Sequence, residues 1–384
     1  MKKLTIYITQ IGHPNFRGGG NIVAHNLSEY FSKRGHKVTT IYLTPKELLS
    51  EKPKTEYNIV LRKNSIIPIV NCLIVAKIIK KLSKVEIPDV VISLGYEGFF
   101  IPHIKSKLLF IAASHSPFLR YIGFKELFLS WKWLNPLNLG KWFFCFSLFL
   151  NRLTKLKADF VQCLCEFGAE QCRVVYKVPN NKIFIISNGI NIKRFFIQLV
   201  SQKKNILFVG GSVEYKGLDI LIRALPIIIK KYSDIELIII GEMDKREKTL
   251  RQLVGKLDVS SNISWQGLVS QDKMAGFYQK AYLTVLPSRL DLFPITALEA
   301  MSSGIPLVAT NVGGLPEIIE DGVSGLIINK EDSEELATAI IKLLDDPKKA
   351  EEMGKKGREI VEQKFTWEKV VEKYEKEIYN RLNT

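Results

Sequence analysis

Two carboxylic acids eight positions apart, Asp291 and Glu299, flank an apolar run in the segment PSRLDLFPITALEAMSSGIPLVAT (287–310). Pro294 lies between them, and proline suits the first turn of a helix because it lacks the N–H that would stay unpaired there. The other N–H groups of such a turn favour an anion. Glu299, about one turn further on, can accept two hydrogen bonds from a vicinal diol. The pattern predicts a site for a ligand with phosphate and sugar hydroxyls; for two acids alone, a surface carboxylate pair is the alternative.

A second candidate site element lies upstream, in FVGGSVEYKGLDILIRAL (208–225). This segment is typical of a strand, a glycine turn and a helix, with Lys216 and Gly217 at the helix start. Glycine allows the backbone to approach a ligand, and a lysine there acts as a point charge for phosphate.

The first half of the chain has two comparable turns. RGGG (17–20) places Gly18, Gly19 and Gly20 between the first expected strand and the first expected helix. ASHSPF (113–118) presents His115 directly after a strand. Taken alone, a histidine in that position favours a structural role over a ligand contact.

Short apolar runs rich in β-branched residues alternate with helical patterns and would position these turns. Strands are expected at 4–9, 38–43, 90–94, 108–113, 160–165 and 183–187, and then at 206–210, 237–241, 263–265, 283–286, 307–310 and 326–329. Runs that are apolar on both faces and separated by helices indicate parallel sheets covered on both sides. Two such series predict an α/β protein with two doubly wound, Rossmann-like domains, whose ligands bind at the carboxyl ends of the strands, in a cleft between the domains.

The boundaries follow from the segments that lack strand patterns. The polar segment NIKRFFIQLVSQKKN (191–205) separates the two series, so we expect domains at 1–195 and 196–365. The final segment, 366–384, begins with the N-cap candidate Thr366 and has its apolar residues on one face, as in an amphipathic helix.

Positive charge is concentrated in the first half of the chain. The net charge is +16; residues 1–200 hold 29 Lys and Arg against 11 Asp and Glu, and residues 201–384 hold 26 against 28. Such a half favours an anionic neighbour, although a solvated lysine surface is the alternative. Nucleic acid is a poor candidate, because zinc-finger, RRM and helix-turn-helix spacings are missing.

The segment 118–157 combines one acid, Glu126, with lysines, arginines and aromatic residues. Trp131, Trp133, Trp142 and Phe143 alternate with Lys132 and Lys141. This mixture indicates a helix in the interface of an anionic membrane, and a buried hairpin helix is the alternative. A spanning helix or signal peptide is not expected, and five cysteines without a CxxC pair fit a reducing, cytoplasmic location at the inner membrane face.

Together these motifs resemble the retaining glycosyltransferases of the GT-B fold, family 4. The resemblance rests on RGGG with NLSEYFSKRGHKV (26–38), ISNGINIKRF (186–195), the Lys-Gly turn, the E-x7-E spacing of 291–299 and VGGLPEIIEDGVSGLI (312–327). It implies an acceptor-binding first domain, a nucleotide-sugar-binding second domain and a terminal helix that returns to the first. A nucleoside diphosphate sugar (UDP-, GDP- or ADP-linked) would be the donor, without metal or other cofactor.

The resemblance also implies roles for individual residues. Glu299 would bind the ribose hydroxyls, Asp291 would face the transferred sugar, and Lys216 would neutralise the diphosphate. His115 would contact sugar hydroxyls and Gly18–Gly20 would border the diphosphate. The backbone of the remaining candidates would hold sugar and phosphate oxygens; these are Leu292, Phe293, Pro294 and Ile295.

Two positions depart from the family pattern. Asp291 stands where the family usually has glutamate, and Gly211 stands where it commonly has arginine; Arg289 is a candidate to replace that cation. From the resemblance we expect transfer of a hexosyl group to a glycan or lipid-linked acceptor. A donor-binding non-catalytic subunit and a sugar-nucleotide epimerase are the alternatives.

Overall fold

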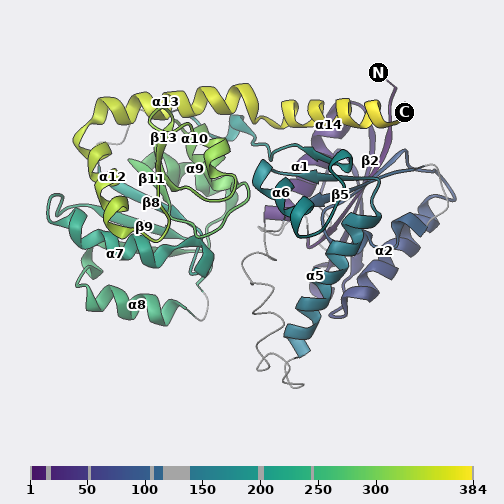
Figure 1. The fold of residues 1–384 in the computed structure, drawn as a ribbon, viewed down its shortest axis with the longest axis horizontal. Helices are drawn as coiled ribbons and strands as arrows, with labels where there is room; N and C mark the ends of the chain where they lie inside the picture. The colour runs from purple at the N-terminus through teal and green to yellow at the C-terminus, as the bar shows by residue number, and fades with distance from the viewer. Residues whose placement is uncertain are drawn as a thin grey trace. The chain divides into compact units, whose positions relative to one another are not determined.

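The computed structural model describes residues 2–13, 19–50, 53–103, 108–115, 139–197, 203–243 and 246–382, and for residues 103 and 139–145 it describes the backbone alone. The chain divides into two compact units. Unit 1 comprises Met1–Asn188 with Trp367–Thr384, and unit 2 comprises Gly189–Thr366. Each unit is built around one sheet (Figure 1).

Unit 1 contains a seven-stranded sheet in the order β3-β2-β1-β4-β5-β6-β7, with its strands paired in parallel. Its strands are β1 Thr5–Ile11, β2 Lys37–Thr44, β3 Asn58–Lys63, β4 Val90–Ser93, β5 Leu109–Ser114, β6 Phe160–Cys163 and β7 Ile183–Ile185. Its helices are α1 Gly19–Lys33, α2 Pro68–Leu82, α5 Leu139–Lys157, α6 Glu166–Val174 and α14 Trp367–Leu382. The order reverses between β1 and β4, which is the topological switch point where ligands of such sheets bind.

Unit 2 contains a six-stranded parallel sheet in the order β10-β9-β8-β11-β12-β13. Its strands are β8 Asn205–Val209, β9 Glu236–Ile240, β10 Ile263–Gly267, β11 Leu283–Leu286, β12 Leu307–Thr310 and β13 Gly325–Ile328. Its helices are α7 Leu218–Ile229, α8 Glu247–Lys256, α9 Gln271–Lys280, α10 Ile295–Ser302, α11 Leu315–Ile318, α12 Ser333–Asp345 and α13 Pro347–Lys364. Here the order reverses between β8 and β11.

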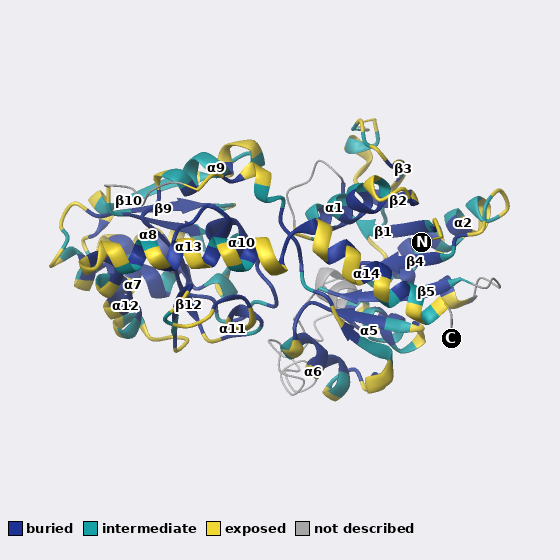
Figure 2. Ribbon diagram, turned by 90° about the horizontal axis from the view of Figure 1, so that it is seen from above, coloured by how far each residue is buried: buried dark blue, intermediate teal, exposed yellow. Residues whose placement is uncertain are grey.

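The inner strands are largely buried on both faces, as their continuous apolar runs predict, whereas the edge strand β10 is only partly buried. Figure 2 shows most residues of the inner strands as buried and the outer faces of the helices as exposed. In unit 2, apolar residues of β8, β9 and β11 form one core with α7 and α12. The prediction of two doubly wound α/β domains is confirmed. It overlooked β3, an edge strand that is only partly buried.

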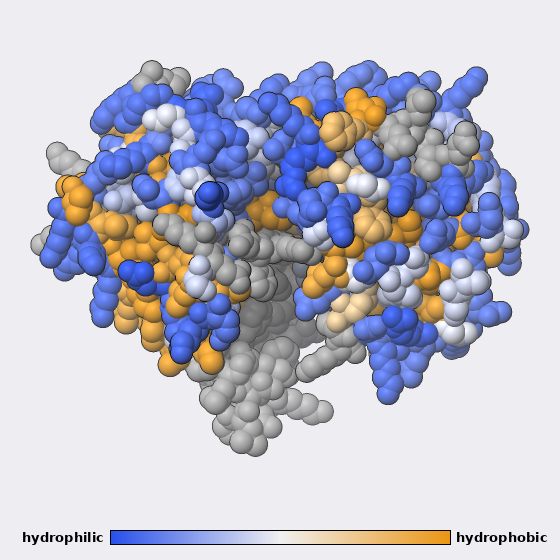
Figure 3. Space-filling model, turned by 180° about the vertical axis from the view of Figure 1, so that it is seen from behind, coloured by the Kyte–Doolittle hydropathy of each residue, from blue (hydrophilic) through white to orange (hydrophobic). Residues whose placement is uncertain are grey.

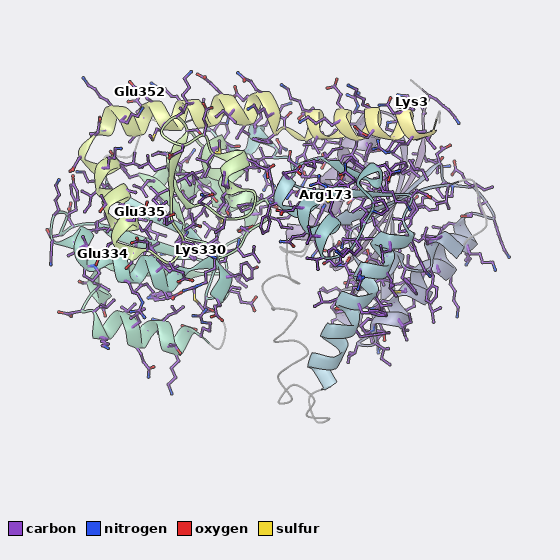
Figure 4. All side chains as sticks on the ribbon, viewed as in Figure 1. Lys3, Arg173, Lys330, Glu334, Glu335 and Glu352 are labelled. Carbon is purple, nitrogen blue, oxygen red and sulfur yellow. The ribbon has the colours of Figure 1, made fainter. Side chains whose placement is uncertain are left out.

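Charged side chains cover the outside and also define helix ends. Asp332 caps α12, because its Oδ1 accepts hydrogen bonds from the backbone N–H groups of Glu334 (3.1 Å) and Glu335 (2.8 Å). Figure 4 shows both glutamates at this first turn, where their charge suits the helix dipole.

The C-terminal helix α14 packs in unit 1 through apolar and ionic contacts. The Tyr374 ring meets Phe31 and Phe184 edge to face. The buried Glu375 carboxylate accepts hydrogen bonds from Arg34 and lies 2.7 Å from Nε2 of His36. Since His36 Nδ1 accepts the N–H of Leu4, Nε2 carries the proton and donates it to Glu375.

Candidate functional site

Lys216 and Asp291 form an ion pair at the carboxyl ends of β8 and β11. Lys216 ends a short 3-10 turn, Glu214–Lys216, and its Nζ lies 2.6 Å from Asp291 Oδ2. The side chains are 18% and 13% exposed, so a ligand could reach them while water screens them little. Burial acts to lower the pKa of Lys216, but the Asp291 carboxylate holds it above its ordinary value. The lysine is therefore a fixed cation.

Two glycines hold the backbone on either side of this pair. Gly217 has φ +71° and caps α7, and a Cβ on it would lie 1.9 Å from the carbonyl oxygen of Pro287. Gly313 has φ +57°, and a Cβ there would lie 1.6 Å from the carbonyl oxygen of Asp291. That same oxygen accepts the N–H of Gly314 at 3.1 Å. Only glycine fits these approaches, so the backbones of Lys216 and Asp291 are closely constrained.

Gly211, the position without the family's usual arginine, cannot hold a side chain in this backbone. Its φ is +64°, and a Cβ would lie 2.2 Å from the carbonyl oxygen of Glu242. The structure thus gives a steric reason for this departure from the pattern.

Arg289 is engaged within unit 2 by two carboxylates. Its guanidinium donates to both carboxylate oxygens of Asp219 at 2.9 and 2.8 Å, and to Glu331 at 2.5 and 3.0 Å. It also donates to the carbonyl of Glu214, while its N–H donates to the carbonyl of Tyr215. Hydrogen bonding to Asp219 raises the pKa of Arg289 above its usual range. These bonds attach Arg289 to the turn that carries Lys216.

The segment between the two acids forms the start of α10. Leu292 and Phe293 are buried, and the Phe293 ring meets Phe365. Pro294 is the N-cap residue and Ile295 the first helical residue. The first N–H groups of a helix have no acceptor within it, so this start could hold an anionic oxygen.

Glu299 lies on α10, where its side chain is nearly enclosed. It is 6% exposed, and Tyr278 of α9 donates a 2.8 Å hydrogen bond to Oε2. Burial raises the pKa of Glu299 to about 7, although the bond from Tyr278 acts to lower it. A carboxylate oriented in this way can accept hydrogen bonds from the two hydroxyl groups of a diol.

In unit 1, His115 follows β5 directly. Its Nε2 lies 2.9 Å from Oε1 of Gln162 on β6, and burial lowers its pKa to about 4. Gly19 and Gly20 are the first residues of α1. Gly18, Trp131, Lys132 and Trp133 lie outside the described residues, and the side chains of Lys141, Trp142 and Phe143 are not described.

Sequence reasoning missed three residues that hold the candidates in place: Tyr278, Gln162 and Gly313 in its contact with Asp291. Tyr278 and Gln162 are 21 and 47 positions from their partners, and no local spacing connects them. Gly313 lies within the motif VGGLPEIIEDGVSGLI, where two consecutive glycines after a strand are the available signal.

Among the described residues, we find no group of three His, Cys, Asp or Glu side chains that could hold a metal ion. In the same part of the chain, no helix has the length and apolar character needed to cross a bilayer.

Two family models match the chain. One, described as glycosyl transferases group 1, matches residues 190–360, and the other, glycosyltransferase family 4, matches residues 17–194. The GDP-mannose-dependent monoacylated alpha-(1-6)-phosphatidylinositol monomannoside mannosyltransferase of Corynebacterium glutamicum is 35% identical over 203 residues, covering 48% of this chain and 52% of the relative. The chain spans about half the length of the curated relatives it matches.

Solved structures with the same architecture cover the whole length. Sucrose-phosphate synthase of Thermosynechococcus elongatus superposes with a TM-score of 0.80 at 21% identity, with 99% of each chain covered. HepE of Anabaena in complex with UDP gives 0.77 at 17% identity, covering 98% of this chain and all of its own. At these identities the likeness establishes the fold.

Proposed function

Because this chain belongs to the family 4, group 1 glycosyltransferases of the GT-B fold, we propose that it transfers a hexosyl group from a nucleoside diphosphate sugar. The acceptor would be a glycan or a lipid-linked molecule at the cytoplasmic face of a membrane, and the reaction would retain the anomeric configuration without a metal ion. The observation that carries the proposal is the ion pair of Lys216 and Asp291, held by glycine contacts at the ends of β8 and β11.

Unit 2 would bind the donor. Glu299, oriented by Tyr278, would accept hydrogen bonds from the ribose diol, and the start of α10 would hold an oxygen of the sugar or diphosphate. A structure of HepE contains UDP and another contains UDP-glucose, which favours a nucleotide sugar as ligand here too.

The chemical step is departure of the diphosphate from the anomeric carbon. Negative charge grows on the leaving phosphate while the sugar becomes oxocarbenium-like. A preorganised cation is worth most where charge develops, so Lys216 would supply much of the stabilisation. Asp291, which holds Lys216 in the free protein, would then face the positive sugar ring. The same ion pair would thus serve both charges of the transition state.

Unit 1 would bind the acceptor and the membrane. Residues 58–85 contain six Lys or Arg and no Asp or Glu. Within this stretch Ile66, Ile67 and Leu73 are exposed, and α2 packs with α5, whose Phe146 and Phe149 are also exposed. On the face drawn in Figure 3, hydrophobic residues reach the surface among hydrophilic ones. Apolar side chains among cations are typical of proteins that lie on anionic headgroups.

Donor identity is tested with UDP-, GDP- and ADP-hexoses, by thermal shift and by release of the nucleoside diphosphate. We expect one donor to stabilise the protein and to be hydrolysed slowly without acceptor. Binding without hydrolysis or transfer would instead identify a non-catalytic subunit, and an epimerised nucleotide sugar would identify an epimerase.

Membrane association is tested separately with liposomes. Changing Lys77, Lys80, Lys81 and Lys84 to glutamine should lower binding to anionic vesicles. The same number of lysines on α13 of unit 2 (Lys348, Lys349, Lys355 and Lys356) provides the control. Equal binding of the native protein to neutral and anionic vesicles would contradict the assignment.

A further inference from the structure

Gln162 has hydrogen-bond partners that determine which of its amide atoms points where. Its Nε2 lies 2.5 Å from the carbonyl oxygen of Ile186, and its Oε1 lies 2.9 Å from Nε2 of His115. A carbonyl oxygen can only accept, so the amide nitrogen must be the atom that faces Ile186. The backbone of Ile186 is itself fixed, because its N–H donates to the carbonyl of Cys163 on β6. The amide therefore has one orientation.

This orientation assigns the proton on His115. The amide oxygen of Gln162 also can only accept, so His115 Nε2 must carry a hydrogen and donate it. A neutral imidazole has one N–H, which leaves a lone pair on Nδ1.

Burial, with a further contribution from the buried ammonium group of Lys155 on α5, keeps the imidazole from gaining a second proton near neutral pH. The thiols of Cys163 and Cys172 are the other titratable groups that interact with Lys155, together with Glu97.

We infer that Gln162 is a positioning residue that holds His115 in its Nε2–H form, so that Nδ1 accepts a hydrogen bond from a substrate hydroxyl. The tautomer follows from unit 1 alone, whereas the substrate contact rests on the proposed function. An acceptor atom at this position selects a ligand that offers an O–H and disfavours a phosphate oxygen, which has no hydrogen to donate. His115 would therefore contribute to sugar specificity and leave the diphosphate charge to Lys216.

The tautomer is measured directly by nitrogen NMR of the full-length protein labelled at histidine. The chain has five histidines, and the His115 signals are identified by their loss in His115→Gln. We expect a protonated Nε2 and an unprotonated Nδ1 at neutral pH. A proton on Nδ1 would overturn the inference whatever the activity, and this measurement needs no variant of Gln162.

Gln162→Met removes both amide interactions and should yield a mixture of the two tautomers. The matched control is Gln171→Met: Gln171 is a buried glutamine of α6 in the same unit, and its Nε2 has no hydrogen-bond partner among the described residues. The control should keep the native tautomer. An unchanged His115 spectrum in Gln162→Met would overturn the inference.

The substrate contact is tested with the donor that the enzyme turns over, for example UDP-glucose or GDP-mannose, and with the deoxyfluoro analogues of that donor. In the native enzyme we expect one position at which loss of the hydroxyl lowers kcat/KM about tenfold, and in Gln162→Met we expect that penalty to shrink. Equal penalties in both proteins would overturn the contact. If none of the UDP-, GDP- and ADP-hexoses is turned over while the tautomer is as expected, the proposed function fails and the assignment of Gln162 stands.

Discussion

The two units treat charge in opposite ways at their strand ends. In unit 2 the ionisable groups that follow β8 and β11 are paired: Lys216 lies against Asp291, and Arg289 lies between Asp219 and Glu331. In unit 1 burial favours the neutral forms instead. It lowers the pKa of His115 to about 4 and raises that of Glu97, which accepts hydrogen bonds from Thr9 and Ser93, to about 7.

The difference indicates that the two units suit different chemical groups. A unit whose cations are held by carboxylates suits the diphosphate of a donor, whose negative charge increases during the reaction. A unit with neutral donors and acceptors suits sugar hydroxyls, whose recognition requires correctly placed hydrogen bonds and little charge. The contrast can be tested by changing corresponding groups in each unit.

The largest effect is expected from the two lysines. Lys216→Met should lower kcat/KM for donor cleavage by about 100- to 1000-fold, since it removes a cation aimed at the leaving group. Lys155 of unit 1 is more deeply buried than Lys216, with its Nζ 2.5 Å from Asn151 Oδ1, and Lys155→Met should leave kcat/KM within a few-fold. Steady-state kinetics measures both; similar losses in the two variants would remove the contrast.

Glu97 should affect the pH dependence of stability. Its pKa rises on folding from an ordinary value of 4.5 to about 7, so its contribution is fully present below pH 4.5 and is lost as the pH rises through 7. Glu97→Gln should therefore recover up to about 3 kcal/mol at pH 8 and change little at pH 4.5. Glu299→Gln is the counterpart in unit 2. Urea unfolding at pH 4.5 and pH 8 measures the free energy of unfolding of each variant. If its pH dependence in both variants equals that of the native protein, the buried acids are not the cause of that dependence.

Gly313→Ala tests how firmly unit 2 holds Asp291. The new methyl group would meet the Asp291 carbonyl, so we expect a loss of about 2 kcal/mol beyond the strain of a positive φ, together with lower activity. Gly322→Ala is the matched control, because Gly322 also has a positive φ (+74°), but within the described part of the chain its added Cβ would meet no heavy atom within 4 Å beyond its two neighbours in sequence. Equal destabilisation by the two changes would mean that Asp291 tolerates displacement.

The smallest effect is expected at Tyr278. Tyr278→Phe removes the hydrogen bond that favours ionised Glu299, so the Glu299 pKa should rise above about 7 and donor affinity at pH 7 should fall roughly tenfold. The loss should shrink at pH 8.5, where Glu299 ionises even without the bond. Tyr282→Phe is the control, since its hydroxyl bonds the carbonyl of Leu343. Calorimetric titration with the nucleotide at pH 7 and pH 8.5 measures the affinity of each variant and distinguishes the two.

Much of the fold could be predicted from the sequence because parallel strands are continuous apolar runs with clear ends. β3 was missed because NIVLRK is a partly buried edge strand with polar residues at both ends. Within the site, the helix start at Pro294 and the turn at Lys216 and Gly217 could be predicted, because each depends only on residues close together in the sequence. The contacts of Tyr278, Gln162 and Arg289 depend on which strands and helices become neighbours, and no spacing along the chain encodes that.

The position of α14 has a consequence for biosynthesis. Since Trp367–Leu382 belongs to unit 1, unit 2 is in effect an insertion between two parts of unit 1. The buried partners of α14, among them Phe31 and His36, stay uncovered on the ribosome until α14 emerges. The later half of the chain can therefore complete its own core before the earlier half does, which reverses the usual N-to-C order of domain folding during translation.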